Sequence, residues 1–144
     1  MASLEQQTAY LADENATLEY GRKLAAGLQP GDLVFLHGDL GAGKTTLVRG
    51  ILRGFGHTGS VKSPTYTLLE PYELPSLAVY HFDFYRIGDS RELAFIGIDE
   101  LMDSNAVKLV EWPQRGANSL PTPDVEIEML VENEGRRIDV AVAR

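Results

Sequence analysis

The glycine-rich segment 38–45 is the feature that most constrains how this chain can fold. It fits the pattern G-x-x-x-x-G-K-[ST] at Gly38, Gly43, Lys44 and Thr45. A continuous apolar run, 33–36, precedes the segment, and residues 45–55 follow with apolar side chains at helical spacing. A strand, a glycine-rich loop and a helix in this order are what phosphate binding by a P-loop requires. The sequence therefore predicts a P-loop that binds a nucleotide.

Each part of the predicted loop has a chemical role. The glycines allow backbone amides to turn toward phosphate oxygens, and the helix N-terminus adds unpaired N–H groups. Lys44 supplies a point charge to the β- and γ-phosphates, while the Thr45 hydroxyl is suited to bind magnesium. We therefore expect ATP and Mg2+ as cofactors. The residues expected to hold them are Gly38, Asp39, Leu40, Gly41, Ala42, Gly43, Lys44, Thr45 and Thr46.

The rest of the chain predicts an α/β fold. We expect a helix over 13–28 with Asp13 as its N-cap, and one or two short helices over 91–102. Further strands are predicted at 65–69, 77–82, 106–110, 125–131 and 136–142. The first two of these are interrupted by Pro71 and Pro75 and pair as a hairpin, and the last two form a C-terminal hairpin. The sum is a P-loop NTPase-like, mostly parallel sheet with flanking helices and antiparallel additions.

Length and composition narrow the class of protein. The 144 residues suit one ATPase domain over 1–144, and the absence of cysteine excludes disulfides and thiolate chemistry. No apolar run reaches the length of a spanning helix and no signal peptide is evident, so a cytoplasmic location without membrane contact is expected. The net charge of -8 argues against independent binding to DNA or RNA. A possible local basic patch near the predicted P-loop helix is better explained as a solvated helix face; its residues are Arg49, Arg53, His57 and Lys62.

Two acidic residues end predicted strands and could complete the site. Glu111 follows the strand 106–110, which is where a magnesium-side acid is expected, and Asp83 follows the strand 77–82. Either could act on the metal or on the attacking water. Thr65 lies in a loop from which a hydroxyl could reach the γ-phosphate, as in switch loops. His81 and Arg86 could contact phosphate or the neighbouring acids, or have structural roles. Trp112 could form an amphipathic cap beside Glu111, or have only a packing role.

Four motifs together resemble the TsaE (YjeE) family. They are Gly38-Asp39-Leu40-Gly41-Ala42-Gly43-Lys44-Thr45-Thr46, Ser63-Pro64-Thr65-Tyr66, His81-Phe82-Asp83-Phe84-Tyr85-Arg86 and Val110-Glu111-Trp112-Pro113. The resemblance covers about residues 10–131 in matching order, and only the C-terminal hairpin is weakly matched.

The resemblance implies a P-loop ATPase needed for N6-threonylcarbamoyladenosine (t6A) at position 37 of tRNAs that read codons beginning with A. It implies that the protein acts on a TsaD–TsaB complex and meets tRNA only through that complex. It also implies roles for four residues: Lys44 as the P-loop lysine, Thr45 as the magnesium threonine, Glu111 as the metal-side glutamate and Asp83 as the essential aspartate. Because no clear arginine finger follows the loop, hydrolysis by the isolated chain is expected to be slow.

Other functions of a P-loop protein remain open at this point. A small-molecule kinase would carry an arginine-bearing lid, and the region 83–102, with only Arg86 and Arg91, matches one poorly. A nonenzymatic switch would use ATP binding alone to dock on a partner. A GTPase is disfavoured because the chain lacks the Asn-Lys-x-Asp guanine signature.

Overall fold

A computed structural model describes residues 4–64 and 67–144. Its strands form a seven-stranded sheet in the order β1-β7-β6-β2-β5-β4-β3. The strands are β1 (Gln7–Leu11), β2 (Leu33–His37), β3 (Leu69–Glu73), β4 (Ala78–Asp83), β5 (Val107–Glu111), β6 (Val125–Glu132) and β7 (Gly135–Val142). The helices are α1 (Glu14–Ala25), α2 (Lys44–Gly54), α3 (Glu92–Phe95), α4 (Ile98–Asp103) and the 3-10 segment η1 (Pro113–Ser119).

The centre of the sheet is parallel and its margins are antiparallel. β2 pairs in parallel with β5 on one side and β6 on the other, and β4 continues the parallel set beyond β5. β7 and β1 are antiparallel additions at one margin, and β3 is the antiparallel edge at the other. The predicted α/β class, with a parallel core and a C-terminal hairpin, is confirmed. The carboxyl ends of four parallel strands therefore meet at one edge of the sheet.

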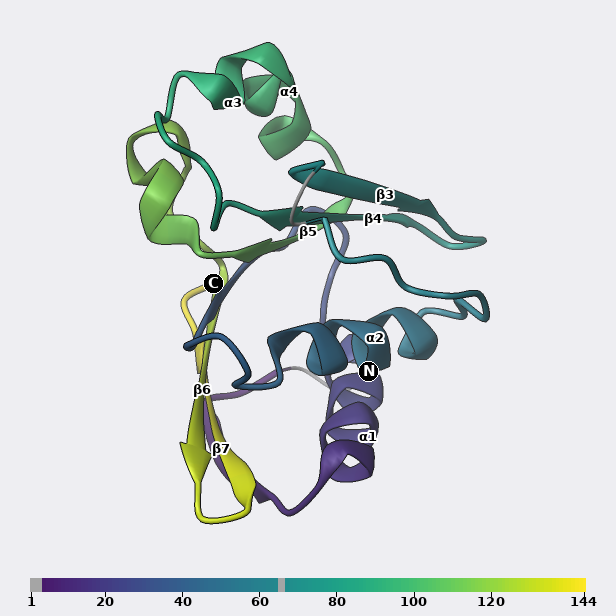
Figure 1. The fold of residues 1–144 in the computed structure, drawn as a ribbon. Coiled ribbons are helices and arrows are strands. Elements are labelled where there is room, and N and C mark those ends of the chain that lie inside the picture. The colour runs from purple at the N-terminus through teal and green to yellow at the C-terminus, as the bar shows by residue number, and fades with distance from the viewer. Residues whose placement is uncertain (1–3, 65–66) are drawn as a thin grey trace.

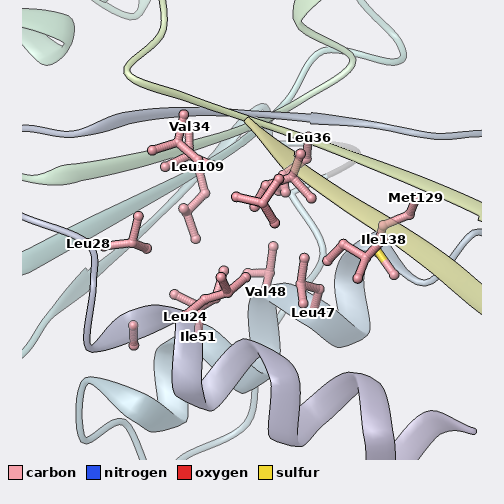
Figure 2. Packing of buried hydrophobic residues seen from close by; sticks show 14 of the residues in the cluster. Leu24, Leu28, Val34, Leu36, Leu47, Val48, Ile51, Leu109, Met129 and Ile138 are labelled. Carbon is pink, nitrogen blue, oxygen red and sulfur yellow. The ribbon is translucent and has the colours of Figure 1, made fainter. Parts of the chain in front are cut away.

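Different helices cover the two faces of the sheet (Figure 1). α1 and α2 lie side by side against one face, where apolar residues of α2 meet those of β2, β5, β6 and β7 (Figure 2). Leu47, Val48 and Ile51 of α2 are fully buried in this cluster. Each such side chain contributes about 1.5–3 kcal/mol by leaving water. The first cluster thus anchors the P-loop helix along its apolar side. A second cluster on the opposite face joins β4 and β5 to α3 and α4.

Most predicted elements occur close to their expected positions. Asp13 caps α1, since its Oδ1 accepts a hydrogen bond from the Ala16 amide at 2.8 Å. The strand that precedes the P-loop extends to His37, and Asp83 and Glu111 are the last residues of β4 and β5. The short helices between β4 and β5 are α3 and α4.

One strand prediction needs correction, and one strand was not predicted. The strand expected at 65–69 instead spans Leu69–Glu73 and runs through Pro71, which was expected to break it. Pro71 is tolerated because β3 is an edge strand with one side unpaired. β1 was not predicted, because most of its side chains are exposed and it lacks apolar alternation. The predicted pairing of β3 with β4 as a hairpin is confirmed.

Thr65, a candidate site residue, lies outside the described residues together with Tyr66. Among the helices of the described segments, none combines the length and apolar character that crossing a membrane requires.

Candidate nucleotide-binding site

The P-loop joins the end of β2 to the start of α2 at the carboxyl edge of the sheet. Gly43 is the N-cap of α2 and has a φ of 98°, a left-handed conformation that favours glycine. Without a side chain it cannot cap the helix, so the N-terminal amides of α2 keep their capacity to bind an anion. The first turn, Lys44-Thr45-Thr46, also carries no acidic residue. A negatively charged ligand would therefore be stabilised at this helix end.

Lys44 lies inside the loop and is only 5% exposed. Its Nζ donates a hydrogen bond to the Gly38 carbonyl at 2.5 Å and lies 4.1 Å from the centroid of a Trp112 ring. Burial lowers the pKa of Lys44, whereas the charges of Glu111, Asp83 and Asp39 act in the opposite direction. The ammonium is therefore a partly desolvated charge that an anionic phosphate would stabilise.

Trp112 has a left-handed φ of 56°, which is uncommon for a bulky residue. Its ring also packs against Tyr85 at a centroid distance of 5.0 Å. The sequence left Trp112 between a site role and ordinary packing, and the structure places it in contact with the P-loop lysine.

Asp83 and Glu111 are opposite each other in the register of β4 and β5. Both are buried, at 6% and 4% exposure, and both side chains belong to the sheet face that α2 covers. Asp83 Oδ1 accepts a hydrogen bond from the Tyr85 amide at 2.9 Å, which orients one carboxylate oxygen. Asp83 and Glu111, which the sequence predicted separately as the ends of two strands, are therefore neighbours in the sheet.

His81 is in β4, next to the strand that carries Glu111, and is fully buried. Its Nε2 lies 2.6 Å from Oε2 of Glu111. An ionised carboxylate oxygen can only accept, so with Glu111 ionised His81 would donate this bond from Nε2. Of the two contacts that the sequence allowed for His81, with phosphate or with a neighbouring acid, the structure shows the second.

Arg136 reaches the P-loop from β7. Its Nε and Nη2 atoms donate hydrogen bonds to the carbonyl oxygens of Ala42 and Gly41, at 3.1 and 2.9 Å. The sequence analysis missed this residue. A signal was available, because Arg136 shares the inward side of β7 with the buried residues Ile138 and Val140, and a charged residue at an inward strand position is unusual.

A cavity of about 460 Å³ opens beside the loop and is within the size range of small-molecule sites. The predicted residues that line it are Leu40, Gly41, Ala42, Gly43, Lys44, Thr45, Thr46, Asp83 and Glu111. Of the loop residues predicted to bind nucleotide, Gly38 and Asp39 are outside this lining. Gly38 instead accepts the Lys44 bond, and the Asp39 carbonyl accepts one from the Ala42 amide at 3.0 Å. Trp112, a further candidate from the sequence, also lines the cavity. Residues that were not predicted complete the wall: Leu11, Asp13, Glu14, Thr17, Ser63, Glu134, Gly135 and Arg136.

The donor set at the cavity fits magnesium. Thr45 offers a hydroxyl oxygen and Glu111 a carboxylate, and both line the same space. Mg2+ in nucleotide sites is bound by one or two carboxylates together with phosphate oxygens and waters. No cluster of three or more His, Cys, Asp or Glu side chains that could hold a metal occurs in segments 4–64 and 67–144.

Comparison with known proteins identifies the family. The model of the family described as "Threonylcarbamoyl adenosine biosynthesis protein TsaE" matches residues 11–138. The chain belongs to the TsaE family. The match extends through β6 into β7, so it includes most of the hairpin that the four motifs covered weakly.

Individual TsaE relatives agree over nearly the whole chain. A protein of Haemophilus influenzae named tRNA threonylcarbamoyladenosine biosynthesis protein TsaE is 42% identical, over 95% of this chain and 90% of its own length. The protein of the same name from Rickettsia bellii is 36% identical, over 96% of this chain and 95% of its own length. The crystal structure of YdiB from Bacillus subtilis superposes with a TM-score of 0.81 at 31% identity, covering 99% of this chain and 90% of that one.

Proposed function

We propose that this TsaE-family protein is an ATPase required for t6A37 modification of tRNAs that read codons beginning with A. It acts on a TsaD–TsaB complex and meets tRNA only through that complex. The observation that carries the proposal is the meeting of Lys44, Asp83 and Glu111 at one cavity beside a helix N-terminus. The names of the relatives from H. influenzae and R. bellii supply the pathway.

Nucleotide binding follows from the charges at the loop. Lys44 loses hydration when it is buried, and nearby carboxylates only partly offset that cost. A triphosphate brings negative charge next to the ammonium and next to the amides of α2, so it stabilises both. The carboxylates of Asp83 and Glu111 are close enough to influence the charge of Lys44, which supports a site where the lysine and both acids act on the same phosphate group.

Hydrolysis needs a positioned water and neutralisation of charge on the phosphates. Thr45 and Glu111 would hold Mg2+, which when bound neutralises charge on the β- and γ-phosphate oxygens. His81 contacts Oε2 of Glu111, and Glu111 lines the cavity. Asp83 is proposed on the water or switch side, with one oxygen engaged by the Tyr85 amide. We assign the metal side to Glu111 because His81 restricts its orientation, as partners of metal ligands do.

Dependence on a partner is proposed from the openness of this site. Asp13, Glu14 and Glu134 are exposed at the cavity rim, and Leu40 of the loop is 66% exposed. A docked partner would exclude water from the γ-phosphate and strengthen the charge interactions there. The isolated chain should therefore turn over ATP slowly.

The test is phosphate release from ATP by the chain alone, with the TsaD–TsaB pair, and with the pair plus tRNA. The proposal predicts slow release alone and either faster release or an ATP-dependent complex when the pair is added. Rapid release by the chain alone, unaffected by the pair and with no complex detected by size-exclusion chromatography, would contradict it.

The same samples separate the alternatives. A small-molecule kinase would transfer the labelled γ-phosphoryl group of ATP to a metabolite in a screen without the pair. A nonenzymatic switch would form the ATP-dependent complex, and a Glu111→Gln variant with undiminished ATP affinity would support modification fully while releasing no phosphate.

A further inference from the structure

Arg136 connects the C-terminal hairpin to the P-loop. The residue is in β7, and its guanidinium donates to three backbone carbonyls. They are those of Ala42 (Nε, 3.1 Å), Gly41 (Nη2, 2.9 Å) and Gly135 (Nη1, 2.9 Å). Two of these acceptors belong to the loop that begins the phosphate site. We infer that Arg136 is a positioning residue for nucleotide binding, because it fixes the Gly41–Ala42 part of the P-loop in its phosphate-binding conformation.

The geometry of the side chain suits this task. The guanidinium is planar, permanently charged and carries its donors in a rigid fork, so two bonds to adjacent carbonyls define the orientation of both peptide units. The third bond, to Gly135, ties the same fork to the backbone of β7. β7 is itself held between β6 and β1. The anchor for the loop is therefore a strand paired on both sides.

The loop needs such an anchor. Gly41 and Gly43 both have positive φ, and a segment rich in glycine loses much conformational entropy when it is ordered. In a trans peptide, the carbonyl and the following N–H point in opposite directions. Arg136 holds the Ala42 carbonyl, so it also fixes the direction of the Gly43 N–H. Because a charged donor polarises the peptide that it binds, the same contact strengthens that N–H as a donor.

The matched control is the next residue. Arg137 is on the opposite side of β7, is 50% exposed and pairs with Asp139. It carries the same charge in the same strand without contact to the loop. A comparison of Arg136→Ala with Arg137→Ala thus separates a specific effect on the loop from loss of net positive charge.

This inference rests on the proposed ATP binding, and the experiment distinguishes the two. Affinities for ATP, ADP and inorganic triphosphate are measured by calorimetry with magnesium for the parent, Arg136→Ala, Arg136→Lys and Arg137→Ala. We expect Arg136→Ala to weaken all three ligands about tenfold or more, as loss of charge-assisted bonds to the loop implies. Arg136→Lys should recover part of the loss, and Arg137→Ala should match the parent.

Hydrogen exchange supplies a second readout that general destabilisation would not mimic. In Arg136→Ala, amides of residues 38–46 should exchange faster while those of β6 and β7 keep the parent rate. Parent affinity and parent exchange in Arg136→Ala would overturn the inference. So would a loss confined to ATP and ADP with inorganic triphosphate unaffected, since that pattern indicates contact with the nucleoside. If the parent protein binds no ATP, the proposed function fails instead.

Discussion

The Nε2 atom of His81 in β4 lies 2.6 Å from Oε2 of Glu111 in β5, and the imidazole is fully buried. The other ring nitrogen, Nδ1, has no hydrogen-bond partner among residues 4–64 and 67–144. A buried imidazole with one strong contact and one unsatisfied nitrogen is costly for packing alone. The contact with Glu111 offsets part of the cost of burying the His81 imidazole.

Replacing His81 should affect turnover more than binding. We expect His81→Leu to lower ATP hydrolysis about tenfold to a hundredfold, since partners that orient site carboxylates have effects of this size. ATP affinity should change much less, because the ammonium of Lys44 and the loop amides remain. Steady-state phosphate release and calorimetry measure the two effects.

His81→Gln is the matched control, since its side-chain amide can still donate to Glu111. This variant should recover most of the lost turnover. A double variant with Glu111→Gln should be no slower than Glu111→Gln alone, because the two residues act as one unit. Additive losses would show that His81 acts by another route.

Glu111→Gln and Asp83→Asn should each reduce hydrolysis about a hundredfold or more while retaining ATP binding. The amides preserve shape but lose the charge that acts on metal or water. Magnesium titration separates the roles: Glu111→Gln should require more Mg2+ for half-maximal activity, and Asp83→Asn should not. Unchanged turnover in either variant removes that residue from the site.

ATP affinity should fall at alkaline pH earlier than for an ordinary lysine. Burial lowers the pKa of Lys44, so the free protein loses this proton below the usual value of about 10.4. Bound phosphate favours the charged form and raises the pKa of Lys44 in the complex. Affinity is therefore constant while Lys44 is charged in both states, and it decreases as pH rises through the lowered pKa.

The stability of the nucleotide-free protein should respond to Lys44 in the opposite sense. Between the lowered pKa and the usual pKa of lysine, the unfolded chain binds more protons at Lys44 than the folded chain, so the contribution of this group to stability rises with pH.

The change in ATP affinity is measured by calorimetric ATP titrations between about pH 7 and 10. Lys44→Arg remains charged throughout, so an equal decline in that variant would place the titration on another group.

Gly50→Ala should destabilise the fold. α1 and α2 approach each other so closely that a Cβ at Gly50 would overlap the carbonyl oxygen of Leu18. The strain should lower the free energy of unfolding by about 1–3 kcal/mol, measured by urea denaturation. Gly88→Ala is the control, because its nearest contact would be Glu92 Oε2 at 3.9 Å. Equal stability of the two variants would show that the helices can separate without cost.

The sequence predicted the parts of the site that follow one another along the chain. Gly43, Lys44 and Thr45 are adjacent, and their spacing carries the chemistry by itself. Asp83 and Glu111 were found because each ends an apolar strand, although their register as partners required the sheet order. The contact of Arg136 with Gly41 could not be predicted from the sequence, because it depends on the sheet order, in which β7 is next to β6 and β6 is next to β2. β3 was misplaced because the tolerance of Pro71 depends on which strand is at the edge.

The position of β2 between β5 and β6 also sets when the proposed nucleotide site can first form during synthesis. The ribosome releases Lys44 well before either flanking strand, Val107–Glu111 or Val125–Glu132, has been made. Until then the nascent chain has the binding motif but no sheet to support it, and neither Glu111 nor Arg136 exists. If the chain binds ATP as proposed, we therefore expect binding to begin only when translation is nearly complete, too late for ATP to assist early folding.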